Sequence, residues 1–196
     1  LAIPADLSNS DSVRSLFGKV VEAFGRLDVL LNNAGTNAPG VPMGDLTEEQ
    51  WNTVLSVNMT GAFLCAQQAI RLMKRKIHEA VGLLITDRSR PTLRGRIPPP
   101  TRSTKHAITG LTKCICLDGR AFNIACGQID IGNAATEMTD RMTTGAVQPD
   151  GSKVAEPRIH AVHVAEAVLY MANLPLEANV PFMIVMATAM PFAGRG

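Results

Sequence analysis

The sequence has few aromatic residues, few cysteines and no long apolar run. Its 196 residues include one tyrosine, Tyr170, and one tryptophan. The four cysteines form no Cys-x-x-Cys pair, which argues against a disulfide scaffold or a zinc site and favours a reducing compartment, the cytoplasm. The longest nearly apolar stretch, residues 180–193, contains proline and is too short to span a bilayer. No metal site and no membrane partner are therefore predicted.

The remaining composition predicts one folded domain over residues 1–196. A hydrophobic content of 46% is too high for a disordered chain, and the length allows one core of ordinary size. The chain opens on Leu-Ala-Ile-Pro-Ala-Asp, without a methionine, a basic segment or an apolar segment of the kind that signal peptides carry. We therefore expect this start to be the interior of a longer sequence.

Apolar periodicity predicts alternating helices and strands. Residues 1–3 fit the tail of a strand, and the apolar run that ends at Asn32-Asn33-Ala34-Gly35 fits a central parallel strand. Such alternation predicts an α/β fold, with helices on both faces of a parallel sheet. The expected strands are 27–31, 124–131 and 181–187, with a doubtful one at 82–85. The expected helices are 47–73, 103–122, 163–171 and a first helix that follows possible caps at 8–10 and ends near Gly25.

Residues 82–104 interrupt this pattern with arginine and proline. Residues 71–105 hold ten of the 19 basic residues and two of the 17 acidic ones, so this stretch carries +8 against −6 for the remainder. Arginines attract phosphate, but the segment has no interleaved aromatic residues and no known binding motif, so nucleic acid is not predicted as a partner. A local frameshift in the coding DNA would also produce such a segment, and resequencing tests that hypothesis.

Several short motifs, in order and at matching spacing over nearly the whole chain, resemble the short-chain dehydrogenase/reductase family. They are Asp6-Leu7, Phe24-Gly25-Arg26-Leu27-Asp28, Asn32-Asn33-Ala34-Gly35, Asn58-Met59-Thr60-Gly61 and Thr104-Lys105-His106-Ala107. The resemblance implies a Rossmann-like doubly wound sheet and an NAD(P)-dependent oxidoreductase. Such an enzyme moves hydride between nicotinamide and a small-molecule carbonyl or secondary alcohol.

The resemblance also implies a set of cofactor-binding residues. Asparagine and glycine after a strand allow a tight turn and a close approach of the backbone to a flat ligand at the sheet edge. In the family, an Asp-hydrophobic pair contacts the adenine ring and a lysine bonds the nicotinamide ribose. The positions in this chain that match are Asp6, Leu7, Asn33, Ala34, Gly35, Lys105, Gly127 and Ile131.

The catalytic positions match the family only in part. Asn58 matches an asparagine that holds a water in a proton relay, and Ser89 loosely matches the serine that polarises the substrate carbonyl. An asparagine inside a helix predicts a local helix irregularity or a held water. The family places its proton-donating tyrosine four residues before the lysine, on the same helix face. Here that position is Thr101, whose aliphatic hydroxyl is far too weak an acid to substitute.

The family's Gly-rich phosphate loop has no counterpart in this sequence. Such a loop lies between the first strand and the first helix, and residue 1 matches a point near the end of the third strand. We therefore expect a partial Rossmann domain without the first strands, and the sequence does not distinguish NAD from NADP. Residues 132–160 resemble the substrate lid. The helices at 47–73 and 103–122 resemble those that form the family's homo-oligomers.

Two functions remain open at this point. The first is an NAD(P)-dependent oxidoreductase of the short-chain type, with activity impaired in this chain. The second is a catalytically silent relative or fragment that acts as a binding or oligomerisation partner. The absence of the tyrosine and of the phosphate loop favours the catalytically silent relative, whereas the family motifs favour the oxidoreductase.

Overall fold

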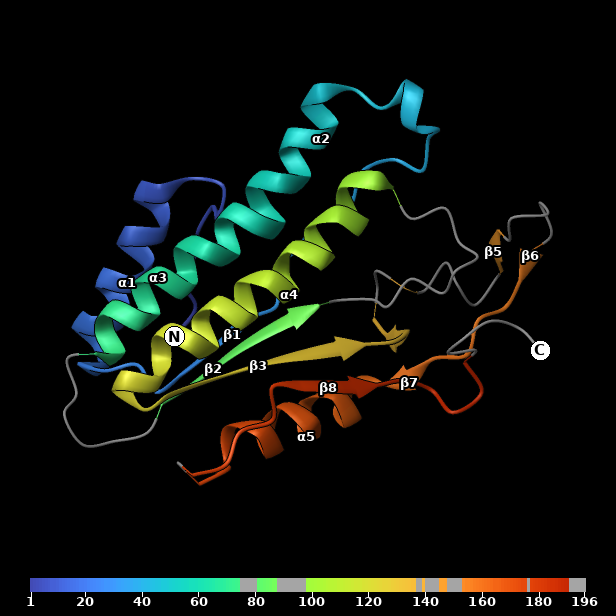
Figure 1. Ribbon diagram of the computed structural model, residues 1–196. Coiled ribbons are helices and arrows are strands. Elements are labelled where there is room, and N and C mark those ends of the chain that lie inside the picture. Colours follow the sequence, from blue (N-terminus) through green and yellow to red (C-terminus); the bar gives the residue numbers. More distant parts are fainter. Residues whose placement is uncertain are drawn as a thin grey trace.

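The computed structural model describes residues 1–74, 81–87, 98–136, 139, 145–147, 153–175 and 177–190. At its centre is a four-stranded sheet in the order β1-β2-β3-β8, and every neighbouring pair is parallel (Figure 1). The strands are β1 (Val29–Asn32), β2 (Val81–Asp87), β3 (Ile124–Ile131) and β8 (Phe182–Val185). The predicted α/β fold with a parallel sheet is confirmed, and the doubtful strand at 82–85 forms β2 between β1 and β3.

Helices cover both faces of the sheet (Figure 1). On one face lie α1 (Ser10–Phe24), α3 (Ala62–Met73) and α4 (Pro99–Gly119), and on the other lies α5 (Ala161–Ala172). The buried residues form two clusters, one on each side. The larger contains Phe17, Met73 and Ile115, and the smaller contains Ile129, Ile131 and Met171. The core is therefore divided by the sheet, as in a doubly wound fold.

The predicted helix over 47–73 is interrupted by a π-helical segment. It consists of α2 (Glu48–Leu55), the π segment η2 (Ser56–Gly61) and α3, and Thr47 caps it through a reciprocal hydrogen-bonded pair with Gln50. Asn58 lies inside the π segment. The irregularity that the sequence predicted at this asparagine is therefore confirmed.

Helix α4 runs antiparallel to β3 and packs closely on it. Near its C-terminal end the Sγ of Cys116 donates to the carbonyl oxygen of Cys126 at 3.1 Å. One turn further, a Cβ on Gly119 would lie 2.6 Å from the carbonyl oxygen of Ile124, so only glycine allows this approach. The N-terminal end of α4 consequently lies over the carboxyl ends of the strands.

Helix α4 begins earlier than predicted and ends in a short 3₁₀ turn. Prolines occupy its first turn, where the missing N–H removes no helical hydrogen bond, and η3 (Arg120–Phe122) follows its last residue. The strand expected at residues 1–3 is wrong, because these residues have no regular structure. Ser89 and residues 88–97 of the Arg/Pro-rich segment lie outside the described residues.

Several short elements complete the described chain. They are η1 (Met43–Asp45), the parallel pair β4 (Ala134–Ala135) and β7 (Ile159–His160), and the antiparallel pair β5 (Ala146–Val147) and β6 (Lys153–Val154). No helix in the described ranges is long and apolar enough to cross a membrane. Among the same residues, no three His, Cys, Asp or Glu side chains are placed to share a metal ion.

Candidate cofactor and catalytic site

The residues after β1 are tied to the π-helical segment by Asn58. Its Oδ1 accepts from the backbone N–H of Thr36 at 2.7 Å, and its Nδ2 donates to the carbonyl oxygen of Thr36 at 2.9 Å. A Cβ on Gly35 would lie 3.4 Å from the same Oδ1, so the loop passes close beside the amide. Two hydrogen bonds to one backbone unit fix the loop relative to the helix. The geometry thus gives Asn58 a role in holding Asn33, Ala34 and Gly35 at the sheet edge.

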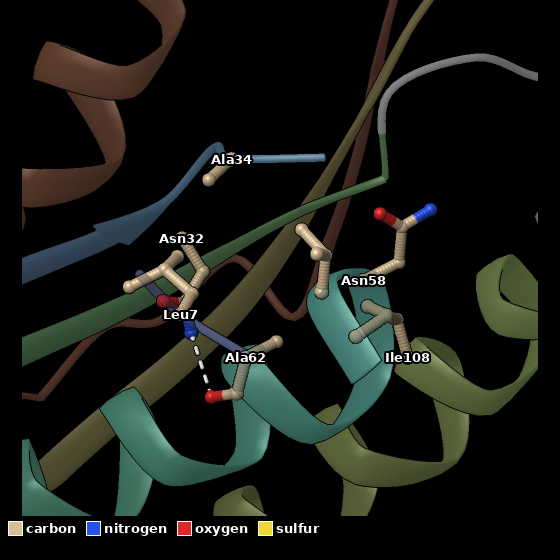
Figure 2. A pocket seen from close by; sticks show the side chains of 7 residues that line it. Leu7, Asn32, Ala34, Asn58, Ala62 and Ile108 are labelled. Atoms are coloured by element: carbon tan, nitrogen blue, oxygen red, sulfur yellow. Dashed lines mark hydrogen bonds between the residues drawn. The ribbon is translucent and has the colours of Figure 1, made fainter. Parts of the chain in front are cut away.

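A water-sized cavity lies beside this contact, at the carboxyl end of β1 (Figure 2). The side chain of Asn32 crosses from the sheet to the helix, where its Nδ2 donates to the carbonyl oxygen of Ala62 at 3.2 Å. The lining comes from the N-terminal segment, the end of β1, the π segment, α3 and α4: Leu7, Asn32, Ala34, Val57, Asn58, Ala62 and Ile108. Three of the predicted site residues, Leu7, Ala34 and Asn58, are thereby brought together.

We expect replacement of Asn58 to loosen this loop. Asn58→Asp keeps the acceptor for Thr36 N–H but places an anion against its carbonyl, and Asn58→Leu removes both hydrogen bonds. Asn58→Leu should lower the free energy of unfolding by about 2 kcal/mol, because two half-buried backbone groups lose their partner, and Asn58→Asp should lower it by about 1 kcal/mol, because only the carbonyl of Thr36 loses its donor. Urea unfolding measures this change, with Asn52→Ala on the exposed side of α2 as the control. An equal effect in Asn52→Ala would contradict the assigned role of Asn58.

Lys105 and Thr101 share one face of α4, one turn apart, and both are buried. Lys105 is 8% exposed and Thr101 is 4% exposed. The Oγ of Thr104 donates to the carbonyl oxygen of Thr101 at 3.0 Å, whereas the hydroxyl of Thr101 itself has no hydrogen-bond partner among the described residues. A buried ammonium is costly unless it is compensated, and Lys105 does have an interaction partner. The helix therefore places the buried Lys105 one turn after a hydroxyl that is too weakly acidic to act as a proton donor.

The other predicted cofactor residues lie apart from this cluster. Asp6 is exposed, and hydrogen bonds from the side chain and the backbone N–H of Ser8 lower the pKa of its carboxyl. Gly127 and Ile131 are on the face of β3 that packs against α5, which is opposite to the face under Lys105. A Cβ on Gly127 would meet the carbonyl oxygen of Val180 and the Cε of Met171. The absence of a side chain at Gly127 therefore allows β3 to pack closely against α5 and residue 180. This glycine lies four residues before the end of the strand.

The residues just beyond the end of β3 were not predicted from the sequence as site residues. Because the strand ends at Ile131, the first residues at its carboxyl edge are Gly132 and Asn133. Asn133 is buried, its Nδ2 donates to the carbonyl oxygen of Pro157 at 3.3 Å, and its own carbonyl oxygen accepts from Ile159. A glycine followed by asparagine directly after an apolar run was the available signal. These contacts connect the strand end to residues 157–159 of the expected lid.

Comparison with known proteins now places the chain in a family. A family model described as short chain dehydrogenase matches residues 1–146. The chain belongs to the short-chain dehydrogenase family. It is 31% identical over 138 residues to a 3beta-hydroxysteroid dehydrogenase of Mediterraneibacter gnavus, a match that covers 69% of this chain and 48% of that protein. The chain therefore spans about half the length of this relative.

Two further matches cover more of this short-chain dehydrogenase chain. It is 31% identical over 179 residues to the (2S)-[(R)-hydroxy(phenyl)methyl]succinyl-CoA dehydrogenase subunit BbsD of Thauera aromatica, covering 88% of this chain and 68% of the relative. A solved alcohol dehydrogenase from Thermococcus sibiricus, complexed with 5-hydroxy-NADP, superposes with a TM-score of 0.75. That match covers 95% of this chain and 74% of the other at 22% identity, and it supports the fold. The predicted family and Rossmann-type fold are confirmed.

Proposed function

We propose that this chain belongs to an NAD(P)-dependent oxidoreductase that moves hydride between nicotinamide C4 and a small-molecule carbonyl or secondary alcohol. The observation that carries the proposal is the placement of Lys105. It is buried on the first turns of α4, which lie over the carboxyl ends of the parallel strands. Ligands of doubly wound folds bind outside the carboxyl ends of the strands. A nicotinamide cofactor bound at the carboxyl ends of the strands would therefore lie beside the positively charged Lys105.

The described residues fit the ribose and nicotinamide end of such a cofactor. The buried ammonium of Lys105 would donate to ribose hydroxyls, and the loop held by Asn58 would let Ala34 and Gly35 approach a flat ring. Asp6 and Leu7 would lie near the adenine, as in the family. When bound, the nicotinamide would supply or accept the hydride. The sequence contains no Gly-rich loop for the pyrophosphate, so the fit leaves the central pyrophosphate of the cofactor without its usual partner.

A second candidate function is cofactor binding without turnover. Carbonyl reduction adds a hydride to carbon and a proton to oxygen, and the proton needs an acid beside the substrate. Thr101 occupies the family's tyrosine position with an aliphatic hydroxyl, and Tyr170 is 57% exposed on α5, across the sheet. This placement favours slow or absent turnover in the chain as given. The silent chain would then act as a binding or oligomerisation partner.

Further properties follow from the same proposal. The apolar side chains Phe63 on α3 and Leu117 on α4 are 43% and 60% exposed, and they support a homo-oligomer formed through helices 47–73 and 103–122. Residues 132–160 would form the substrate lid of the single domain 1–196, with Asn133 at its base. We also propose a cytoplasmic location, because the described cysteines are all free thiols.

Cofactor titration with a matched pair of lysine variants tests the proposal. NADH and NADPH fluorescence should report binding to the unaltered chain, and Lys105→Ala should weaken that binding about tenfold, the effect of losing one hydrogen bond from a charged group. Lys113→Ala, on the exposed side of the same helix, should leave it unchanged. Failure of the unaltered chain to bind either nucleotide would overturn the proposal. A turnover assay with a panel of ketones then separates the first candidate from the second.

A further inference from the structure

The chain leaves the carboxyl end of β3 along a segment that is held on both sides. The backbone N–H of Gly132 donates to the carbonyl oxygen of Val185 in β8 at 2.8 Å. A Cβ on Gly132 would lie 2.7 Å from the Cβ of Met186, so only glycine allows this approach. Directly beyond it, β4 pairs in parallel with β7, past the carboxyl ends of β3 and β8 (Figure 1). Residues 132–135 therefore extend the edge of the sheet and do not form a free loop.

The hydroxyl of Thr139 joins this segment to Arg158. Its Oγ donates to the carbonyl oxygen of Ala134 at 2.5 Å, and the carbonyl oxygen of Thr136 is a second acceptor at 3.0 Å. The same Oγ accepts from the backbone N–H of Thr136 at 3.1 Å and from the Nη1 of Arg158 at 3.4 Å. A threonine hydroxyl has one donor and two acceptor lone pairs. The surroundings of Thr139 therefore use its whole hydrogen-bonding capacity.

Further hydrogen bonds close the junction formed by residues 133–136, 139 and 157–159, which we call the lid base. The backbone N–H of Ile159 donates to the carbonyl oxygen of Asn133 at 2.9 Å, and the Nδ2 of Asn133 donates to the carbonyl oxygen of Pro157 at 3.3 Å. Ala134 packs against the apolar cluster under α5. The lid base is therefore attached to the core on the α5 side, which fixes its position relative to β3.

The location of the lid base gives its rigidity a meaning for ligand binding. Ligands of doubly wound folds bind outside the carboxyl ends of the strands, and the lid base borders that end of β3. A backbone segment contributes more to affinity when it is already held in its bound position, because ordering it on binding costs conformational entropy. Valine would fill nearly the same volume as Thr139, so the filling of space does not account for the hydroxyl.

We propose that Thr139 is a positioning residue that, together with Arg158, holds residues 132–136 in place for the bound cofactor. Its hydroxyl acts through the backbone of Ala134 and Thr136, since its hydrogen-bonding capacity is used within the protein. The consequence for cofactor affinity rests on the proposed function, whereas the fixing of the lid base by Thr139 does not.

Amide hydrogen exchange, followed by mass spectrometry, tests the fixing of the lid base without any cofactor. In Thr139→Val the amide of Thr136 loses its acceptor, so peptides that cover residues 132–136 and 157–160 should exchange several-fold faster, whereas exchange in α1 should not change. Thr139→Ser keeps the hydroxyl and should restore slow exchange. The control is Thr112→Val, which removes a buried hydroxyl that donates to the carbonyl oxygen of Ile108 within α4. It should leave exchange at the lid base unchanged.

NADPH titration of the same variants tests the positioning role. Thr139→Val should weaken binding about tenfold, whereas Thr139→Ser should bind within about twofold of the unaltered chain and Thr112→Val should bind equally well. Arg158→Gln removes the guanidinium that contacts Thr139, so it should also speed exchange and weaken binding. Each titration is carried out well below the midpoint of thermal unfolding of the variant, where a merely structural loss of stability does not change the affinity.

The two measurements separate the proposal from the proposed function. Unchanged exchange at the lid base in Thr139→Val would overturn the proposal, and so would faster exchange with undiminished NADPH affinity. Equal losses in Thr139→Ser and Thr139→Val would contradict the role of the hydroxyl. Absence of NADPH binding in the unaltered chain would overturn the proposed function and the positioning role with it, and exchange would still decide the fixing of the lid base. If Thr139→Val does not fold, Thr139→Ser and Arg158→Gln decide the proposal.

Discussion

Turnover should rise about 100-fold or more when Thr101 is replaced by tyrosine, the range expected for a positioned general acid–base group. Position 101 lies one turn before Lys105 on the same face of α4, so a phenol there would come next to the ammonium. Positive charge near a phenol stabilises its ionised form and lowers its pKa. The variant would therefore regain the proton donor that the aliphatic hydroxyl of Thr101 does not provide. The measurement is ketone reduction at saturating NADPH, followed by nicotinamide absorbance.

The matched control is Thr101→Phe, which introduces the same ring without the hydroxyl. Thr101 is 4% exposed, so either ring overpacks the site at a cost of about 1–3 kcal/mol, and thermal unfolding of both variants shows whether they remain folded. A gain of activity in Thr101→Tyr but not in Thr101→Phe would support general acid catalysis by the phenol. That gain should disappear when Lys105→Ala is added to Thr101→Tyr. Equal activity of the two ring variants would contradict the assignment.

Gly127→Ala should destabilise the protein by about 3 kcal/mol, which is at the upper end for overpacking by one methyl group. A Cβ at this position would lie 2.5 Å from the Cε of Met171 and closer still to the carbonyl oxygen of Val180. Methionine can adapt, but a backbone carbonyl moves only together with its chain segment. The strand would therefore have to shift away from residues 178–180. Denaturant unfolding measures the loss.

Gly110→Ala is the control for Gly127→Ala, because a Cβ on Gly110 would have no neighbour within 4 Å. Gly110 lies on the exposed side of α4, where alanine favours the helix by about 0.5–1 kcal/mol. The two glycine variants should consequently change stability in opposite directions. If Gly127→Ala were as stable as the unaltered chain, the packing role assigned to this glycine would be wrong.

The regular elements were predictable wherever periodicity and end signals agreed. Helix α1 was expected to start after caps at 8–10 and to end near Gly25, and it occupies Ser10–Phe24, with Asn9 accepting at its start and Gly25 in the left-handed conformation at its end. Strand β3 was expected over 124–131 and occupies that range. Each has a periodic apolar pattern next to a residue that favours a helix end or a turn, which is Gly25 after α1 and Asn123 before β3. The strand expected at residues 1–3 failed because three apolar residues do not form a strand without a neighbour to pair with.

The site was predictable where a motif fixes local geometry. Asn58 inside a helix pattern indicated an irregularity, and the π segment over Ser56–Gly61 confirms it. The spacing of Thr101 and Lys105 placed both on one helix face. The partners of Asn58 and the cavity lining were not predictable, because Leu7, Ala34, Asn58 and Ile108 are far apart in the sequence and meet only when the interrupted helix over 48–73 and α4 pack on the sheet.

The sequence by itself determined the family, the α/β class and the replacement of the tyrosine by Thr101, because these depend on residue identity and on spacing along one element. Tertiary structure alone decided which face each residue of β3 presents to which helix. In the packed fold, Gly127 lies on the face of β3 that α5 covers, whereas Gln128 and Asp130 lie on the face that α4 covers. A strand's two faces are chemically equivalent until helices cover them, so only the packed fold assigns Gln128 and Asp130 to the face of β3 that α4 covers.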